Sequence, residues 1–268
     1  MTTPAGPFPP DGFLLIAHRG DNRNFPENTL AAFEGALAAG ADMVELDVAL
    51  SADGRPVVIH DDTLDRTTSG AGRVSARTLA EIEALDAGSW FSPRFSGERA
   101  PTLEAVFRRM GGRIRINVEI KKEAAKTAGP FPDVCGQVAG LIRQHGLAGS
   151  VLVSCFDDAV LADFRRIAPE IAIGVLSDRP ETPGEVLGRM EAVKAASYHQ
   201  NAALLTRGVV EALHPRGLRV LAWTGRRENT WETLKKALEC GADGFFADDP
   251  GPMRKLLDGW REKNAGRA

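Results

Sequence analysis

Acidic residues in two apolar segments of the chain have a spacing that suits metal binding. Glu45 and Asp47 lie in one segment, and Glu119 lies in a later one. In an extended strand residues i and i+2 share a face, so Glu45 and Asp47 point the same way. Three carboxylates brought together would repel one another and raise their own pKa values, and a divalent cation removes that repulsion. A set made only of oxygen ligands favours Mg²⁺ or Ca²⁺ over zinc.

Two histidines and two basic residues accompany these carboxylates. His18 and Arg19 follow the first apolar run, His60 follows a short run, and Lys121 stands two positions beyond Glu119. Near neutral pH one histidine can accept a proton while the other donates one. The two cations supply the positive charge that an anionic phosphoryl group requires. The combined set predicts metal-assisted cleavage of a phosphate ester.

Each of these features also has a purely structural interpretation. A single histidine after a strand is more often structural, a Glu-x-Asp pair can form a salt-bridged rim, and Glu-Ile-Lys-Lys can be a solvated strand end. The interpretation as a site rests on their common position at predicted strand ends, because catalytic groups gather at the carboxyl ends of strands in barrel enzymes.

Short apolar runs alternate with amphipathic segments along nearly the whole chain. The predicted barrel strands are Phe13–Ala17, Met43–Val48, Ile114–Ile120, Val151–Ser154, Ile171–Leu176, Ala195–Tyr198, Leu218–Trp223 and Gly244–Ala247. The predicted helices are Leu30–Ala39, Val134–His145, Asp157–Ile167, Arg207–His214, Asn229–Glu239 and Pro252–Trp260. This alternation indicates a parallel sheet buried on both faces. Eight units favour an α/β fold of the TIM-type (β/α)8 barrel class over an open doubly wound sheet, and no GxGxxG opens the first helix.

One region interrupts the alternation after the second barrel strand. Pro56–His60 is a predicted extra strand, and residues 61–101 are mostly polar, with one short predicted helix at Ala76–Leu85. We interpret this region as a small insertion in a single domain that covers residues 1–268. Because the chemistry of barrel enzymes lies on loops after the strands, an insertion at this point should cap the site.

Composition limits the classes of partner. The chain has 268 residues, 43% of them hydrophobic, which suits one large α/β domain. A net charge of -3 argues against nucleic acid, which needs a basic face, and leaves a small-molecule substrate. No segment has the pattern of a signal peptide or a membrane span, so we expect a cytoplasmic protein. The sequence carries no signal for an oligomeric state.

Three cysteines, Cys135, Cys155 and Cys240, are scattered through the chain without the spacing of a zinc site or a disulfide framework. Since cysteine is among the residue types most often found in protein interiors, we expect all three to be buried free thiols.

The chain resembles the glycerophosphodiester phosphodiesterase family from about residue 16 to residue 250. The resemblance rests on an ordered series of motifs: Ala17-His18-Arg19-Gly20, Pro26-Glu27-Asn28-Thr29, Glu45-Leu46-Asp47, the stretch 60–68 that begins His60-Asp61-Asp62, Leu85-Asp86-Ala87-Gly88-Ser89-Trp90, and Asn117-Val118-Glu119-Ile120-Lys121. Each motif alone is weak, and the ordered series is highly specific.

The resemblance implies a TIM-type barrel enzyme that hydrolyses glycerophosphodiesters, such as glycerophosphocholine or glycerophosphoethanolamine, to glycerol 3-phosphate and an alcohol. By position, it implies that the metal ligands are Glu45, Asp47 and Glu119 and that the acid/base pair is His18 and His60. It also implies that Arg19 and Lys121 are the cations that face the phosphate, and that Trp223 forms an aromatic wall on the glycerol side. It further implies that Glu27 and Asn28 orient the first loop and reach toward the metal or the substrate.

In the implied mechanism, the glycerol 2-hydroxyl of the substrate attacks phosphorus to give a cyclic phosphate, which water then opens. We assign His18 as the acid and His60 as the base, although the sequence does not distinguish them. The chain departs from the family pattern at Gly225-Arg226, where Val-Asn is usual, and at Ala247, where Thr is common. Arg226 would add a contact to an anionic headgroup, or else it is a solvent-facing arginine before a helix.

Three other functions fit parts of the pattern. A glycoside hydrolase would also pair strand-end carboxylates, but only 6% of the residues are aromatic and the two histidines would have no role. A phosphodiester-binding relative without catalysis conflicts with the intact histidines. A phosphodiesterase acting on lysophospholipids or sphingomyelin would share the same core, but no amphipathic segment for membrane docking is evident.

Overall fold

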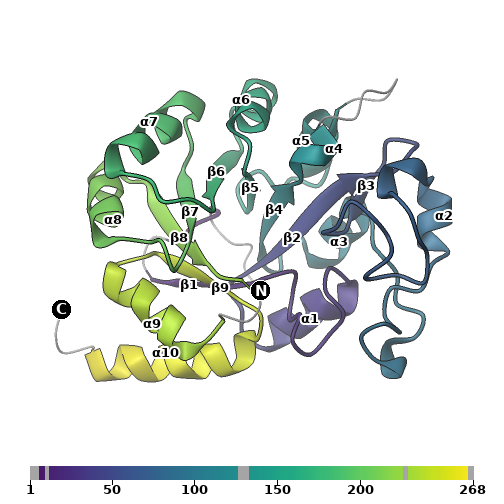
Figure 1. The fold of residues 1–268 in the computed structure, drawn as a ribbon, viewed down its shortest axis with the longest axis horizontal. Coiled ribbons are helices and arrows are strands. Elements are labelled where there is room, and N and C mark those ends of the chain that lie inside the picture. The colour runs from purple at the N-terminus through teal and green to yellow at the C-terminus, as the bar shows by residue number, and fades with distance from the viewer. Residues whose placement is uncertain (1–5, 10–11, 126–132, 226–228, 265–268) are drawn as a thin grey trace.

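Eight parallel strands close on themselves in this computed structural model, which describes residues 6–9, 12–125, 133–225 and 229–264 (Figure 1). The barrel strands are β1 (Leu14–Ala17), β2 (Met43–Leu50), β4 (Arg115–Ile120), β5 (Val151–Cys155), β6 (Ala172–Ser177), β7 (Ser197–Asn201), β8 (Arg219–Trp223) and β9 (Gly244–Ala247). Each pairs with its neighbours, and β1 pairs with both β2 and β9, which closes the ring. The predicted TIM-type barrel is therefore confirmed, and the open sheet is excluded.

Helices follow the strands and surround the barrel (Figure 1). They are α1 (Leu30–Ala38), α3 (Leu103–Met110), α4 (Lys122–Ala125), α5 (Val134–Gln144), α6 (Asp158–Ile167), α7 (Pro183–Val193), α8 (Arg207–Leu213), α9 (Trp231–Cys240) and α10 (Pro250–Asn264). The six predicted helices are present, whereas α3, α4 and α7 were not predicted. Gly184 and Gly188 hide α7 in the sequence, yet a capping box between Thr182 and Glu185 fixes its start.

Alternation along the strands separates two cores. Outward side chains such as Val44, Leu46 and Val48 belong to the large core between strands and helices. Inward side chains form a smaller cluster inside the barrel, made by Leu14, Ile16, Met43, Leu152, Leu221 and Phe246, with partly buried Phe8, Ala172 and Trp223 packed against it. Glu45 and Asp47 alternate with the outward residues, so the period of two places both carboxylates inside the barrel, as predicted.

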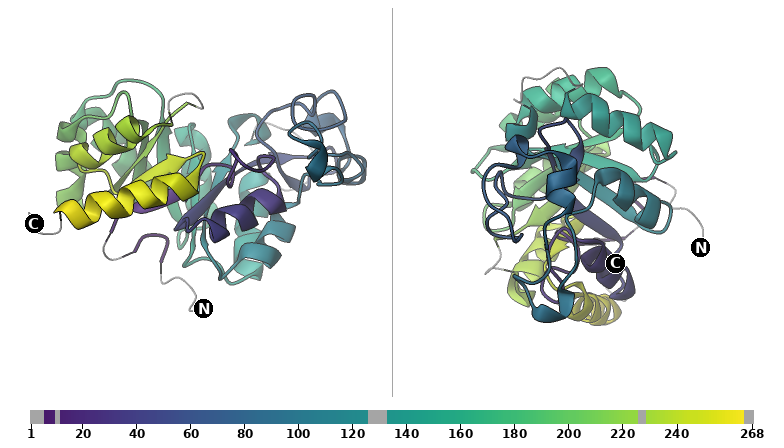
Figure 2. Two further views of the ribbon diagram at one scale, coloured as in Figure 1. Left: turned by 90° about the horizontal axis from the view of Figure 1, so that it is seen from below. Right: turned by 90° about the vertical axis from the view of Figure 1, so that its right-hand side faces the viewer.

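The insertion after β2 lies at one side of the barrel (Figures 1 and 2). Strand β3 (Pro56–Val58) runs antiparallel to β2, and the insertion has its own small core with buried Ile59, Leu64, Val74 and Ile82. The predicted helix at Ala76–Leu85 was too long. A 3₁₀ turn occupies Val74–Ala76, and the α-helix α2 covers only Leu79–Glu83, because a capping box between Thr78 and Glu81 starts it there.

Two expectations about the chain as a whole can be compared with the structure. Cys135 and Cys155 are buried free thiols, but Cys240 is only partly buried because it ends α9 near the surface. The prediction for Cys240 was therefore wrong. Within the described ranges, every helix is too short or too polar to cross a membrane.

Candidate active site

A cavity of about 420 Å³ opens at the carboxyl ends of the barrel strands. Its wall contains seven of the predicted site residues: His18, Arg19, Glu45, His60, Glu119, Lys121 and Trp223. Asp61 and Arg66 of the insertion also line it, so the insertion contributes to the wall of the cavity. The structure thus brings residues from five separate strands or their following loops to one place.

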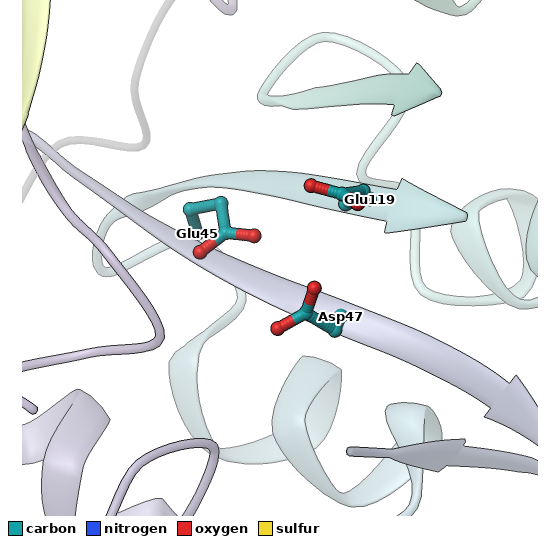
Figure 3. A group of neighbouring side chains, drawn as sticks. All are labelled: Glu45, Asp47 and Glu119. Carbon is teal, nitrogen blue, oxygen red and sulfur yellow. The ribbon is translucent and has the colours of Figure 1, made fainter. Parts of the chain in front are cut away.

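The three predicted metal carboxylates converge inside this end of the barrel. Figure 3 shows Glu45 and Asp47 along β2 and Glu119 on the adjacent strand β4. One oxygen from each lies within 4.8 Å of the others. Parallel pairing places Asp47 beside Glu119, and Glu45 one inward position deeper. Asp47 is fully buried behind the cavity wall, whereas Glu119 is partly exposed.

The electrostatics of this trio fit a cation. Burial, with the nearby charges of Asp47 and Glu119, raises the pKa of Glu45 well above its usual range. One of its oxygens, Oε2, accepts a hydrogen bond from the Arg19 backbone N–H at 2.8 Å, while the buried Oε1 has no donor. Burial would also raise the pKa of Asp47, but Arg19 and Lys121 hold it below its usual range. A desolvated cluster of carboxylates that includes one oxygen without a donor is what a hard divalent cation binds.

The turn after β1 has an unusual backbone that serves the trio. Arg19 and Asn28 both adopt positive φ, 56° and 58°, and the Arg19 carbonyl accepts the Asn28 N–H at 3.0 Å. Gly20 also has positive φ, and a Cβ there would lie 2.6 Å from the Ala32 backbone. Bulky residues rarely adopt this conformation, so its use at Arg19 marks a constrained segment. The constraint aims the Arg19 N–H at Glu45.

Each histidine is held at Nδ1 by a carboxylate. His18 Nδ1 lies 2.8 Å from Asp248 Oδ1, and His60 Nδ1 lies 2.6 Å from Asp61 Oδ1. Burial lowers the pKa of His60, with Asp47 acting in the opposite direction. Since Nδ1 is engaged in both rings, Nε2 is the nitrogen left for a ligand in the cavity.

A chain of ion pairs joins the insertion to the metal carboxylates. Arg66 binds Asp61 through Nε and Nη2, and Glu27 through both terminal nitrogens, at 2.6 to 2.9 Å. Glu27 in turn accepts a bond from Arg19 Nη1 at 2.9 Å, and Arg19 Nε lies 3.4 Å from Asp47 Oδ2. The insertion therefore helps to fix the orientation of both Asp61 and Arg19.

The remaining predicted residues contact the trio directly or lie opposite it. Asn28 donates to Asp47 Oδ2 at 2.9 Å, and neither Asn28 nor Glu27 lines the cavity, so both orient charged groups. Lys121 Nζ lies 3.0 Å from Glu119 Oε1 and 3.5 Å from Asp47 Oδ1. Trp223 lines the cavity and meets Phe156 edge to face, with ring centroids 5.9 Å apart.

The two departures from the family pattern lie in different surroundings. Gly225 lines the cavity, whereas Arg226 lies outside the described residues. Ala247 is fully buried at the end of β9, one residue before Asp248.

Sequence reasoning assigned no role to several polar residues at the site, among them Asp61, Arg66, Asn117 and Asp248. Asp61 and Asp248 each directly follow a residue already noted, and a search for carboxylates beside strand ends would have found both. Asn117 lines the cavity from β4, two positions before Glu119. The same period of two that selected Glu45 and Asp47 would have selected it.

A second cavity of about 500 Å³ adjoins the first. The two share wall residues Glu119, Lys121, Phe156 and Leu176. The second cavity extends over the ends of β5 and β6 and has a polar wall with Asp157, Asp178 and Arg179. The space for a ligand therefore extends past the trio, on the side away from the loop that carries His60.

Comparisons with known proteins agree with this geometry. The sequence pattern of the Glycerophosphoryl diester phosphodiesterase family matches residues 18–252. A glycerophosphodiester phosphodiesterase from Caldanaerobacter subterraneus subsp. tengcongensis is 38% identical over 246 residues, which are 91% of this chain and 97% of the relative. One from Bacillus altitudinis is 36% identical over 249 residues, 91% of this chain and 98% of the relative.

Solved structures show the same barrel. A phosphodiesterase from Oleispira antarctica, in complex with the product sn-glycerol-3-phosphate, superposes with a TM-score of 0.81 at 32% identity, covering 91% of this chain and 96% of that one. A glycerophosphodiester phosphodiesterase from Agrobacterium tumefaciens gives a TM-score of 0.77 at 32% identity, covering 92% and 99%. The predictions of an enzyme and of this fold are thereby confirmed. The chain belongs to the glycerophosphoryl diester phosphodiesterase family.

Proposed function

We propose that this protein hydrolyses glycerophosphodiesters, such as glycerophosphocholine and glycerophosphoethanolamine, with the help of a divalent cation and two histidines. One observation carries the proposal. A trio of carboxylates, two of them buried and one with an unpaired oxygen, lies at the wall of a cavity that two histidines also line, each histidine held at Nδ1 by its own carboxylate. Metal-assisted phosphoryl chemistry needs these groups together, and a sugar hydrolase would not need the histidines.

Glu45, Asp47 and Glu119 would hold the cation, and their oxygen-only chemistry suits Mg²⁺ or Ca²⁺. When bound, the cation supplies positive charge that offsets the charge developing on the phosphoryl oxygens. Arg19 and Lys121 add to this charge from the protein side, since both line the cavity.

The two histidines divide the proton transfers. His60 has a lowered pKa, so it is neutral near pH 7 and its Nε2 accepts the proton of the glycerol 2-hydroxyl. As that oxygen bonds to phosphorus, the bond from phosphorus to the alcohol oxygen breaks, and His18 Nε2–H protonates the departing alcohol. Asp248 stabilises the imidazolium form of His18 from the opposite side of the ring.

Water then opens the cyclic phosphate with the roles reversed. His18 accepts a proton from water as the water oxygen bonds to phosphorus, and His60 returns its proton to the leaving 2-oxygen. The products are glycerol 3-phosphate and the alcohol, and both histidines regain their starting states. Asp61 and Asp248 hold the rings in place through both steps.

The two adjoining cavities support a diester as the substrate. The first, with its aromatic wall at Trp223, accommodates the glycerophosphoryl half, and the second accommodates the alcohol. The structure of the Oleispira antarctica neighbour holds the product sn-glycerol-3-phosphate, which supports glycerol 3-phosphate as a product of this chain.

The test is release of glycerol 3-phosphate from glycerophosphocholine by the wild-type protein and by His18→Ala, in chelator, Mg²⁺ or Ca²⁺. We expect release that needs a metal and falls by about 10²- to 10⁴-fold in the variant. Circular dichroism and metal binding of the variant control for folding.

A panel of other glycerophosphodiesters, a lysophosphatidylcholine micelle and an aryl glycoside complete the experiment. If the protein hydrolysed only the lysolipid, lysophospholipids would replace glycerophosphodiesters as the substrate class. Release of glycerol 3-phosphate without a metal would contradict the role of the trio. If the protein bound every diester but released no product, it would be a binding protein and not an enzyme.

A further inference from the structure

Asn117 presents an unused hydrogen-bond acceptor to the catalytic cavity. The residue lines the cavity, and its side chain is buried, with 1% of its surface exposed. Its amide Nδ2 donates to Ser154 Oγ at 3.1 Å, whereas its Oδ1 is buried and has no partner in the part of the chain that the structure describes. A buried polar atom without a partner costs roughly 1–3 kcal/mol, so its retention inside a binding cavity indicates that a ligand supplies the donor.

The position of Asn117 makes a hydroxyl group the fitting donor. Parallel pairing aligns Asn117 with Glu45 and Glu119 with Asp47, so Asn117 lies about 6–7 Å deeper than Glu119, at two residues of strand rise. Asp47 and Glu119 are the trio members at the upper level, and the longer side chain of Glu45 reaches up to them. The short amide of Asn117 stays below, at the floor of the cavity.

Apolar side chains lie close to Asn117 on the cavity wall and below it. Trp223 and Phe246 line the same cavity, and Phe246 and Leu152 belong to the apolar cluster inside the barrel. Leu152 also pairs in register with Asn117 on the neighbouring strand. An acceptor beside an apolar surface can bind one hydroxyl while the surface packs against the carbon atoms around that hydroxyl.

We infer that Asn117 Oδ1 accepts a hydrogen bond from the terminal hydroxyl of the substrate's glycerol, and so makes the site specific for glycerol that is not acylated at that position. This inference rests on the proposed function and names a specificity residue for it. The glycerol 2-hydroxyl attacks phosphorus in the proposed reaction. The terminal hydroxyl is therefore the group that points away from the reacting atoms. An acyl group on that oxygen would remove the donor and would need space in the closed floor of the barrel.

The test compares two ligands on three proteins by calorimetry in the presence of Mg²⁺. The ligands are glycerol 3-phosphate and its counterpart in which the terminal hydroxyl is replaced by hydrogen. The proteins are wild type, Asn117→Leu and Ser154→Ala. We expect the wild type to prefer glycerol 3-phosphate by about 10- to 100-fold, the preference expected for a buried acceptor left unpaired by the second ligand.

Asn117→Leu should lose this preference, because its side chain has a similar size and no acceptor. Ser154→Ala breaks the same Asn117–Ser154 bond but keeps the amide oxygen, so it should keep the preference. The role of Asn117 would be overturned if Asn117→Leu preferred glycerol 3-phosphate as strongly as the wild type does. It would also be overturned if Ser154→Ala alone lost this preference.

Two further outcomes separate this inference from the proposed function. A wild type that binds neither ligand would overturn both. A wild type that hydrolyses glycerophosphocholine but has no preference between the two ligands would overturn only the role of Asn117.

Discussion

His18 Nδ1 lies 2.8 Å from Asp248 Oδ1, although 230 positions separate the two residues in the sequence. The backbone prepares this contact, because β1 pairs with β9 and the His18 N–H donates to the Ala247 carbonyl at 3.0 Å. Asn22 Nδ2 also donates to Asp248 Oδ1, at 2.8 Å. Burial would raise the pKa of Asp248, but His18 and Asn22 lower it, so the carboxylate stays ionised beside the ring.

We expect Asp248→Asn to lower kcat for glycerophosphocholine by about 10²-fold or more, because the variant removes the charge that supports protonated His18. Metal affinity should stay within about twofold, since Asp248 is not part of the trio. Asp249→Asn is the matched control, because Asp249 lies outside the cavity wall and accepts only a long bond from Asn24. Equal kcat for the two variants would remove the proposed role of Asp248.

Arg66 should act on catalysis through His60. The guanidinium binds Asp61 and Glu27 together, and a lysine cannot reproduce that planar double contact. We expect Arg66→Lys to lower kcat about 10-fold. Steady-state kinetics checks this expectation, with Arg73→Lys, an exposed change in the same insertion, as the control. A change of KM alone would instead assign Arg66 to substrate binding.

Metal binding should release a proton. Burial and the neighbouring carboxylates raise the pKa of Glu45, so the metal competes with a proton on this residue. Metal affinity should therefore rise with pH until Glu45 is ionised. Calorimetry in two buffers of different ionisation enthalpy measures the released proton. Glu45→Gln should bind the metal more weakly and release no proton from this position, and proton-independent binding by the wild type would contradict the assignment.

His199 should make the fold sensitive to acid. The ring is fully buried inside the barrel, and burial lowers its pKa to about 3. Between about pH 6.5, the usual value, and pH 3, the unfolded chain therefore binds a proton that the folded chain does not. The free energy of unfolding should fall on acidification through this range, by at most about 1.4 kcal/mol per pH unit from this residue.

Urea denaturation at pH 7 and pH 5 measures this dependence. His199→Gln should be less stable at pH 7, since it loses the bond between Nε2 and Ser197 Oγ, but its stability should fall less between the two pH values. The same fall in both proteins would assign the acid sensitivity to other groups.

Local patterns in the sequence carried the prediction of the barrel and of the trio. Glu45 and Asp47 were found because period-two alternation is a property of a single strand, and the apolar runs marked all eight barrel strands. The helix α7 was missed because Gly184 and Gly188 interrupt its apolar pattern.

The missing parts of the site depend on contacts between distant segments. Asp248 becomes a partner of His18 only when the last strand pairs with the first. Arg66 reaches the site only through the packing of an irregular insertion, for which no periodic pattern exists. Asn117 lay inside an apolar run, where only the period of two marks it, and the structure adds a buried oxygen without a partner among the described residues.

The pairing of β1 with β9 also has a consequence during synthesis on the ribosome. A nascent chain that lacks residues 244–248 has neither the strand that closes the ring nor the carboxylate that supports His18. Such a chain keeps open sheet edges at β1 and β8, and unpaired edges recruit other chains and chaperones. Prematurely terminated polypeptides should therefore be substrates for quality control, and hydrolytic activity in a cell should report only on fully translated molecules.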